Sequence, residues 1–154
     1  MLSSRARYAT RAILELSLLY SKGTVQIHNI AERQNIPLKF LQQILVSLKM
    51  TGFVQSRKGP TGGYFLAMDP KEITLGAVVR AMDGPIAPVS CVSVTQYGEC
   101  GCPDPDRCSL REAFKAARNA MSEVLDGTTF ADLVEMQRAK ADGSTDLLIA
   151  DCEL

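Results

Sequence analysis

The chain has 154 residues, of which 46% are hydrophobic, and it carries 17 basic and 17 acidic side chains but no tryptophan. This length predicts one small domain with an appendage, or a small domain completed by dimerisation, and the composition excludes a mainly disordered protein. Residues 1–83 carry eleven Lys and Arg against five Asp and Glu, whereas residues 84–154 carry six against twelve. Such an uneven distribution is typical of a protein that binds a polyanion with one half and keeps the other half away from it.

The first predicted element is a helix from Arg5 to about Tyr20. Apolar side chains recur there at helical spacing, and Lys22-Gly23 follows as a stop signal. Its apolar run is interrupted by Glu15, is not followed by a cleavage site of small residues, and is too short to cross a bilayer. We therefore expect a cytoplasmic protein with no membrane contact, in a reducing compartment where structural disulfides are disfavoured.

Two shorter helices and a hairpin are predicted next. The first helix covers Ile27 to Gln34, and the second begins at Pro37, a favourable first helical residue, and ends at about Met50. Two short helices joined by a tight break are typical of a helix-turn-helix. Strand-like segments at 53–57 and 64–67 then flank a Gly-rich loop, which predicts the hairpin of a winged helix.

Further helices are predicted on both sides of a long loop. Thr74 caps a helix that ends at Met82, and the loop of residues 84–107 contains four prolines. Ser109-Leu110-Arg111-Glu112 has the pattern of a capping box that opens a helix to about Leu125, and a last helix covers about residues 130–140. The long helix carries one apolar face, made of Leu110, Ala113, Phe114, Ala117, Met121, Val124 and Leu125. Such a face needs a partner, and a second copy of the chain is the simplest one.

The predicted fold is mostly α with a small β-hairpin wing: a winged helix-turn-helix followed by a long dimerisation helix. We expect a winged-helix DNA-binding domain at residues 1–83, a cysteine-rich sensor loop at 84–108, dimerisation helices at 109–140 and a flexible tail at 141–154. No Ser/His/Asp or carboxylate arrangement indicates hydrolysis, and the Gly-rich loop lacks the Lys-Ser/Thr ending of a phosphate-binding loop. We therefore expect no enzyme activity.

Polar side chains on the predicted recognition helix and wing have the chemistry to contact a DNA duplex. Gln42 or Gln43 can bond adenine through two hydrogen bonds, which contributes about 1–3 kcal/mol of base discrimination, and Lys39 can contact guanine or phosphate. Arg57 and Lys58 lie beside glycines, so the wing backbone can approach the minor groove or a phosphate. Each residue alone is equally consistent with a solvated surface, but the set favours DNA. The predicted DNA-binding residues are Lys39, Gln42, Gln43, Arg57, Lys58, Thr61 and Arg7.

Four cysteines, Cys91, Cys100, Cys102 and Cys108, lie within eighteen residues, whereas the first ninety residues contain none. Iron–sulfur clusters need about four ligands, usually thiolates, and a loop allows thiolates to converge. Two alternatives stay open. Four cysteines also suit a structural zinc site, although the C-x2-C pairs typical of zinc are absent. A metal-free thiol switch needs only a nearby positive group, such as Arg107 or Arg111.

Several motifs together resemble the Rrf-two (Rrf2) family of dimeric winged-helix regulators, over about residues 1–138. The matching segments are Tyr8-Ala9, Ile30-Ala31-Glu32-Arg33-Gln34, Phe40-Leu41-Gln42-Gln43-Ile44-Leu45, Gly59-Pro60-Thr61-Gly62-Gly63-Tyr64 and the C-x5-C pair Cys102 and Cys108. The resemblance implies a homodimer on a palindromic double-stranded DNA operator, with the recognition helix in the major groove and the wing in the minor groove. It also implies an iron–sulfur cluster, 2Fe-2S or 4Fe-4S, or a redox thiol that controls DNA binding.

The resemblance implies as cluster ligands Cys91, Cys102 and Cys108. In the family the fourth ligand is often a His three residues after the last cysteine, or an acidic residue of the other subunit, but here that position is Arg111. The spacing from the first to the second of these cysteines is also longer than usual and contains one more cysteine, Cys100. Cys100 is our candidate for the fourth ligand, with Glu99 or an acidic residue of the other subunit as alternatives. Because a C-x-C pair is tight, the roles of an alternate ligand and of a resolving thiol also stay open for Cys100.

The expected function is regulation of transcription, with operator binding controlled by a cluster in the loop and with redox state, nitric oxide or iron–sulfur status as the signal. Cluster loss is expected to move the loop relative to the dimer helix and so change the spacing of the two recognition helices. Both repression and activation are compatible with the sequence. An electron-transfer protein would not need the basic first half, and a DNA-independent interaction module would not lose affinity steeply with salt.

Overall fold

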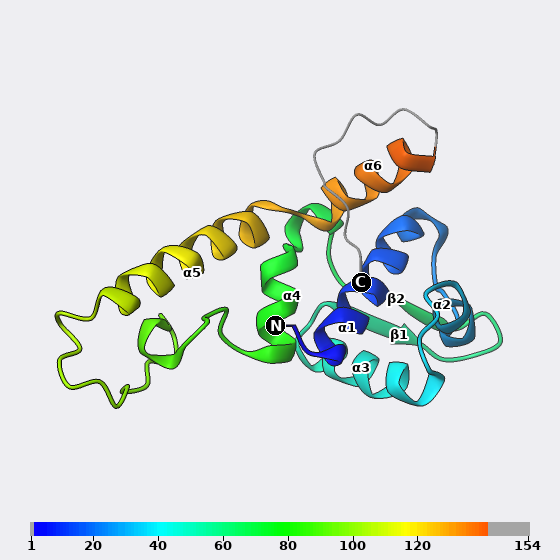
Figure 1. Ribbon diagram of the computed structural model, residues 1–154. Helices are drawn as coiled ribbons and strands as arrows, with labels where there is room; N and C mark the ends of the chain where they lie inside the picture. Colours follow the sequence, from blue (N-terminus) through cyan, green and yellow to red (C-terminus); the bar gives the residue numbers. More distant parts are fainter. Residues whose placement is uncertain (1, 142–154) are drawn as a thin grey trace.

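The computed structural model describes residues 2–141, which form a winged-helix body with a long arm (Figure 1). The helices are α1 (Ser4–Leu18), α2 (Ile27–Arg33), α3 (Leu38–Met50), α4 (Leu75–Asp83), α5 (Ser109–Gly127) and α6 (Phe130–Ala141). The strands are β1 (Val54–Arg57) and β2 (Gly63–Leu66), and three short 3-10 turns are η1 (Tyr20–Lys22), η2 (Pro70–Glu72) and η3 (Ser90–Val92). This architecture confirms the predicted class, mostly α with a small β-hairpin wing. The predicted tail lies almost entirely outside the described residues. Among the residues that the structure describes, no helix is long and apolar enough to cross a bilayer.

Helix α1 lies at the centre of the core, where it packs against α3, α4 and α6. Its alanines Ala6, Ala9 and Ala12 are fully buried, and their small side chains allow the neighbouring helices to approach closely. Helix α6 returns from the arm to this body and buries Phe130 completely in the same core. The predicted inward face of α3 is also confirmed, because its four members are buried: Leu41, Ile44, Leu45 and Leu48.

Replacement of Leu48 by alanine tests this core directly. Leu48 is fully buried on α3, so we expect the change to lower the free energy of unfolding by about 2–5 kcal/mol. Val46 lies on the same helix but is 56% exposed, and its replacement by alanine should change that energy by about 0.5 kcal/mol or less. Urea unfolding of the two variants measures both effects, and equal losses would contradict the assigned orientation of α3.

A buried carboxylate fixes the turn before α3. Glu15 on α1 is only 3% exposed, but its two oxygens accept hydrogen bonds from Arg33 Nη1 at 2.7 Å and from Gln34 Nε2 at 2.8 Å. Arg11 also donates to the Gln34 backbone oxygen. Asn35 then adopts a positive φ of 47°, which turns the chain into α3. The charge that interrupts the apolar sequence of α1 therefore orients the helix-turn-helix.

The wing is an antiparallel hairpin attached to the segment before α2. Its register pairs Val54 with Leu66, Gln55 with Phe65, Ser56 with Tyr64 and Arg57 with Gly63. Val25 and Tyr64 exchange two backbone hydrogen bonds of 2.8 Å, and Thr24 Oγ1 donates to the Thr61 backbone oxygen at 2.7 Å. Gly63 is required here, because its φ is +154° and a Cβ would lie 2.5 Å from the Val25 oxygen. These contacts hold the wing at a fixed angle to the helix-turn-helix.

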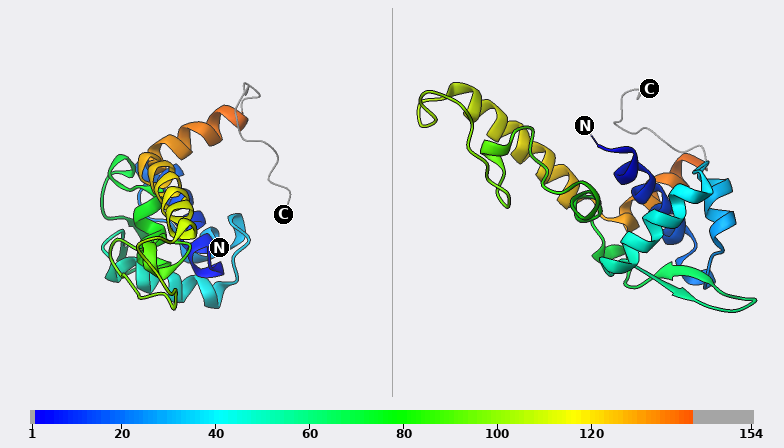
Figure 2. Two further views of the ribbon diagram at one scale, coloured as in Figure 1. Left: turned by 60° about the vertical axis from the view of Figure 1, so that its left-hand side comes forward. Right: turned by 90° about the horizontal axis from the view of Figure 1, so that it is seen from below.

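The cysteine loop runs outward from α4, and helix α5 returns along it to the body, so that together they form the arm (Figures 1 and 2). Its base is anchored by a bidentate ion pair, in which Arg80 Nη1 and Nη2 lie 2.5 and 2.8 Å from the two Asp126 oxygens. Gly76 leaves room for this pair, since a Cβ there would lie 2.1 Å from Asp126 Oδ1. Leu75 N also donates to the Thr128 oxygen at 2.9 Å. The direction of the arm is therefore set at its junction with α4.

The predicted capping box at the start of α5 is wrong. Ser109 is already helical, and the N-cap is Cys108, which has no side-chain capping bond. The Cys108 carbonyl accepts from Arg111 N at 3.1 Å, so the first turn begins one residue earlier than the Ser-x-x-Glu pattern indicates. The last ligand candidate consequently lies on the helix terminus itself.

Acid should weaken the anchor between α4 and α5. The hydrogen bonds from Arg80 lower the pKa of Asp126 below its ordinary value of 3.8. The stabilisation is therefore complete above that ordinary value and is lost as the pH falls through the lower, folded value. We expect Asp126→Asn to lower the free energy of unfolding by about 1 kcal/mol or less near neutral pH, because both side chains are partly exposed. Urea unfolding at several pH values should show this difference disappearing in acid, and a difference that grows in acid would contradict it.

Candidate functional site

The outward face of α3 carries the three residues predicted to contact bases. Lys39, Gln42 and Gln43 are all exposed, and they lie on the side of the helix opposite the buried leucines. A helix held by its apolar face alone leaves this polar face free to enter a major groove, which is wide enough to admit an α-helix. The structure thus brings these three predicted residues together.

Two further cations lie beside this face, and we did not predict them as site residues. Arg5 Nη2 on α1 donates to Ser47 Oγ at 2.7 Å, and Lys49 Nζ on α3 donates to Ser56 Oγ at 2.6 Å. The sequence signal for Lys49 was its position seven residues, or about two helical turns, after Gln42. Arg7, which the sequence predicts as a DNA-binding residue, is exposed on α1, two residues after Arg5.

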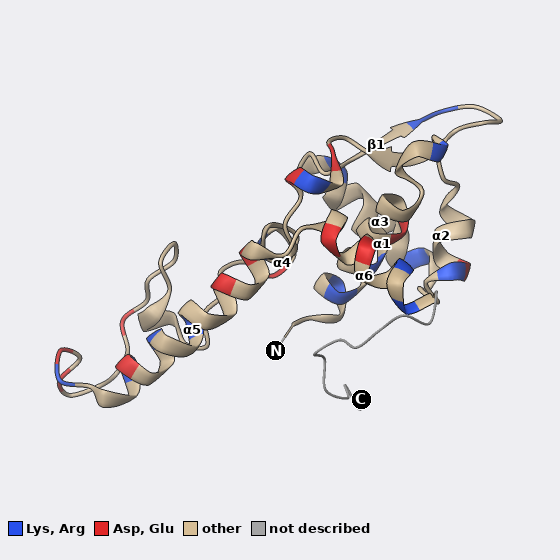
Figure 3. Ribbon diagram, turned by 90° about the horizontal axis from the view of Figure 1, so that it is seen from above, with Lys and Arg blue, Asp and Glu red and all other residues tan. Residues whose placement is uncertain are grey.

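The wing residues Arg57, Lys58 and Thr61 are all exposed, and Figure 3 shows the basic colour along the wing. The Arg57 guanidinium lies 5.9 Å from the centre of the Phe65 ring, which restrains this long side chain. A cavity of about 660 Å³ separates the wing from the start of α2, and Lys22 lines it together with Arg57. The wing and this cleft therefore form one basic edge of the winged-helix body.

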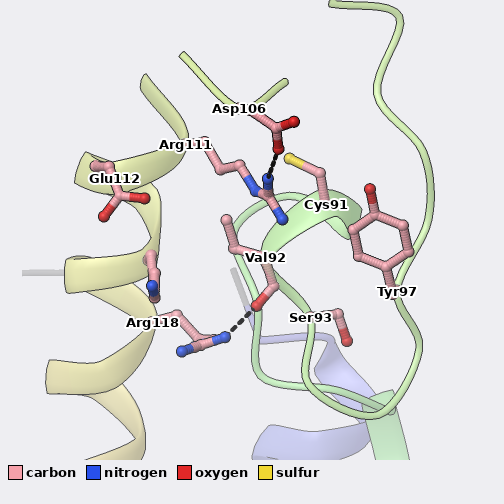
Figure 4. Close-up of a pocket in the computed structure, with 9 residues that line it drawn as sticks. Cys91, Val92, Ser93, Tyr97, Asp106, Arg111, Glu112 and Arg118 are labelled. Atoms are coloured by element: carbon pink, nitrogen blue, oxygen red, sulfur yellow. Dashed lines mark hydrogen bonds and ion pairs between the residues drawn. The ribbon is translucent and has the colours of Figure 1, made fainter. Parts of the chain in front are cut away.

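The cysteine loop packs against α5 around a cavity of about 370 Å³ (Figure 4). Cys91 lies in η3 and is buried, and Arg118 Nη1 on α5 donates to the neighbouring Val92 oxygen. Arg111 extends across the cavity, with Nη1 3.3 Å from the Pro105 oxygen and 3.9 Å from Asp106 Oδ1 (Figure 4). The arginines of α5 therefore attach the loop to the arm.

The four clustered thiols are neighbours in the order Cys91, Cys100, Cys102 and Cys108. Burial raises the pKa of Cys91, and Cys100 raises it further. A hydrogen bond with the Cys102 thiol lowers the pKa of Cys100, and the same bond, followed by burial, raises the pKa of Cys102 to about 11. Cys108 is also a neighbour of Cys102 and raises its pKa. The extra cysteine of this chain thus stands between Cys91 and the C-x5-C pair.

Within residues 2–141, no three His, Cys, Asp or Glu side chains surround a position for a single metal ion. A tetrahedral zinc site is therefore not preformed in this part of the chain. The alternative ligand Glu99 is exposed, and all four thiols of the loop are free. The chemistry of the donor set, four thiols on one loop, fits an iron–sulfur cluster.

The apolar face predicted for α5 is exposed in the single chain. Leu110 and Val124 are each 66% exposed, and Met121 is 41% exposed. Near the base of the arm this face borders a groove of about 780 Å³ between α4 and α5, lined by apolar residues that include Val79 and Ile86. An exposed apolar stripe of this length beside a groove is typical of an interaction surface.

The fold and these surfaces agree with comparisons to known proteins. The family model Rrf2, described as "Iron-dependent Transcriptional regulator", matches residues 2–136. The chain belongs to the Rrf2 family. The chain is therefore a DNA-binding transcriptional regulator of the Rrf2 type.

Similar Rrf2 proteins include both curated sequences and solved structures. The HTH-type transcriptional regulator IscR of Serratia proteamaculans is 37% identical over 136 residues, which are 88% of this chain and 80% of that protein. CymR (YrzC), the global cysteine regulator of B. subtilis, superimposes with a TM-score of 0.76 at 32% identity and covers 88% of this chain and 97% of its own. T. potens IscR superimposes with a TM-score of 0.72 at 25% identity, and the match covers 96% of this chain and 93% of the T. potens chain.

Proposed function

We propose that an iron–sulfur cluster, 2Fe-2S or 4Fe-4S, controls operator binding by this Rrf2 protein. Its ligands are Cys91, Cys100, Cys102 and Cys108. The proposal is supported by four free thiols on one loop, which Arg118 attaches to the arm, and by the family description "Iron-dependent Transcriptional regulator". A bound cluster supplies a centre that gains or loses electrons and reacts with oxidants or nitric oxide. Similarity to IscR proteins supports the same conclusion.

The DNA-binding surface in this proposal combines the outward face of α3 with the wing and with Arg7 of α1. Its residues are Lys39, Gln42 and Gln43 for the major groove, Arg57, Lys58 and Thr61 for the minor groove, and Arg7 for a phosphate. Two copies joined through the exposed face of α5 would place two such surfaces on a palindromic operator. In this division residues 1–83 bind DNA, residues 84–108 sense the signal and α5 joins the protomers.

The coupling runs through contacts in the middle of α5 and at its C-terminal end. Arg118 ties the loop to α5, and the Arg80–Asp126 pair ties α5 to α4 and the winged-helix body. A loop that changes position on cluster loss therefore shifts α5, and with it the distance between the two recognition helices. Operators with fixed half-site spacing bind only one of these dimer geometries well.

Anaerobic purification followed by absorbance and by counts of iron, sulfide and zinc tests this proposal. We expect a coloured protein that contains iron and sulfide in similar amounts and no zinc. A colourless protein with one zinc per chain would contradict it, and so would a protein that holds no metal after reconstitution with iron and sulfide.

A metal-free thiol switch is the second candidate, and the likeness to CymR favours it. In this version two neighbouring thiols, such as Cys91 and Cys100, form a disulfide on oxidation by a peroxide. The disulfide would displace η3 relative to α5. Mass spectrometry of the oxidised protein should then show a loss of two hydrogens that a dithiol reductant reverses, together with a change in DNA binding in the complete absence of iron.

A further inference from the structure

The centre of the outward face of α3 is apolar. Lys39, Gln43, Val46 and Met50 are spaced by four, three and four residues, so they lie along one side of the helix. Val46 is 56% exposed and Met50 is 84% exposed, and neither belongs to the buried core or packs against it. The polar residues proposed to contact bases therefore surround an apolar side chain.

The surroundings of Val46 indicate what it meets. Single apolar residues on a protein surface are common, but Val46 lies within about one helical turn of both Gln42 and Gln43. Lys49 follows it on the same outward side, so the apolar position is flanked by amides and positive charge. A protein partner would have to cover these groups with matching polar atoms, whereas a DNA groove presents phosphates and base edges to them.

A major groove offers one apolar group to such a side chain, the C5 methyl of thymine. Valine is β-branched and has one strongly preferred rotamer in a helix, so its methyl groups are already fixed in space before DNA binds. A valine cannot accept or donate a hydrogen bond, and it would leave the polar edge of a guanine or cytosine without a partner.

We infer that Val46 is a specificity-determining residue that contacts the thymine methyl group at one position of each operator half-site. The inference rests on the proposed function, because it requires α3 to lie in the major groove. It adds a hydrophobic readout of thymine to the hydrogen bonds that Gln42 and Gln43 make. Met50, near the end of the helix, extends the same apolar side toward the operator centre or flank.

Selection of tight-binding duplexes from a random pool, with the purified full-length protein, supplies the operator for the test. Each thymine of the selected site is then replaced by uracil, which removes only the methyl group. We expect one symmetric pair of positions at which this change weakens binding about fourfold per half-site, or about 16-fold for both, as the loss of one buried methyl implies. In the variant Val46→Ala the same replacement should change the affinity by less than about twofold, because the partner of the methyl group is gone.

The exposed position of Val46 means that Val46→Ala should fold normally, and its unfolding curve should match that of the unaltered chain. If uracil weakens binding equally for both proteins, or at no position, Val46 does not read thymine, although DNA binding itself stands. If the unaltered protein selects no duplex at all, in the presence or absence of the cluster, the proposed function fails and the inference fails with it.

Discussion

Cys100→Ala is expected to leave the chain unable to hold the iron–sulfur cluster that we propose. Cys100 stands between Cys91 and Cys102 in the row of neighbouring thiols, and Arg111 occupies the place where the family often has a histidine ligand. The loss should exceed the roughly 10–100-fold fall in metal affinity that follows removal of an outer hydrogen-bond partner of a ligand. Iron and sulfide per chain, measured after anaerobic desalting, should therefore fall at least tenfold.

The chain contains a matched control for this variant. Cys152 is the fifth cysteine of the chain and is not one of the four proposed ligands of the loop, so Cys152→Ala should keep the full iron and sulfide content. Cys102→Ala should lose the cluster as Cys100→Ala does. A Cys100→Ala protein with unchanged absorbance and iron content would contradict the four-cysteine set, and Glu99 or a residue of the other subunit would then be the fourth ligand.

Substitutions in the recognition helix and in the wing should weaken DNA binding in different ways. Gln42→Ala should weaken binding to the selected operator by about 5–150-fold per half-site, since one bidentate pair contributes about 1–3 kcal/mol, and it should relax the base preference at one position of each half-site. The dependence of affinity on salt should stay the same, because a neutral side chain releases no counterions.

The double variant Arg57→Ala and Lys58→Ala should instead weaken binding to all duplexes alike. Each cation that contacts a phosphate contributes about 0.9 to the slope of log affinity against log salt, so two cations in each of two protomers should reduce it by about 3–4. Titration of one labelled operator at several salt concentrations measures both variants. Equal salt slopes for the wing variant and the unaltered protein would contradict the placement of the wing on DNA.

Periodicity predicted the helix-turn-helix and the wing well, for physical reasons. The buried positions of α3 follow a 3.6-residue period that only a helix satisfies. Pro37, predicted as the first helical residue, is the N-cap, so the helix begins one residue later, and the Gly-rich loop marks the hairpin. These signals are local in the sequence, so they do not depend on which elements pack against each other in the fold. The predicted contact residues on α3 are exposed for the same reason, since they occupy the remaining face.

Long-range contacts were not predictable in this way. In the sequence, Glu15 only interrupts an apolar run. In the structure it is buried and accepts hydrogen bonds from Arg33 and Gln34, which are eighteen and nineteen residues further along the chain. The pairing of Arg80 with Asp126 and the return of Phe130 to the core depend on the direction of the arm, which no local pattern contains. The predicted start of α5 was wrong because serine is a residue type preferred at the N-cap, so the sequence favoured Ser109. In the structure the N-cap is the preceding residue, Cys108.

The cysteine loop was predicted as a cluster of thiols, but its internal order came from the structure. The sequence spacing identified Cys100 as an additional cysteine of the loop but did not give its position relative to the other thiols. In the fold its thiol interacts with those of both Cys91 and Cys102. Gly and Pro residues allow many loop paths, so spacing cannot select one. The packing of η3 against α5 through Arg118 selects it.

If the proposed cluster sets the affinity for the operator, that affinity must change when the cluster is removed and recover when it is restored. The dissociation constant of a single selected operator is determined anaerobically for the same preparation with its cluster, after removal of the cluster by a chelator, and after reconstitution. We expect cluster removal to change the dissociation constant by about 5–150-fold, the usual range of coupling between two sites, and reconstitution to reverse the change. Identical affinities in all three states, with iron content confirmed in each, would contradict it.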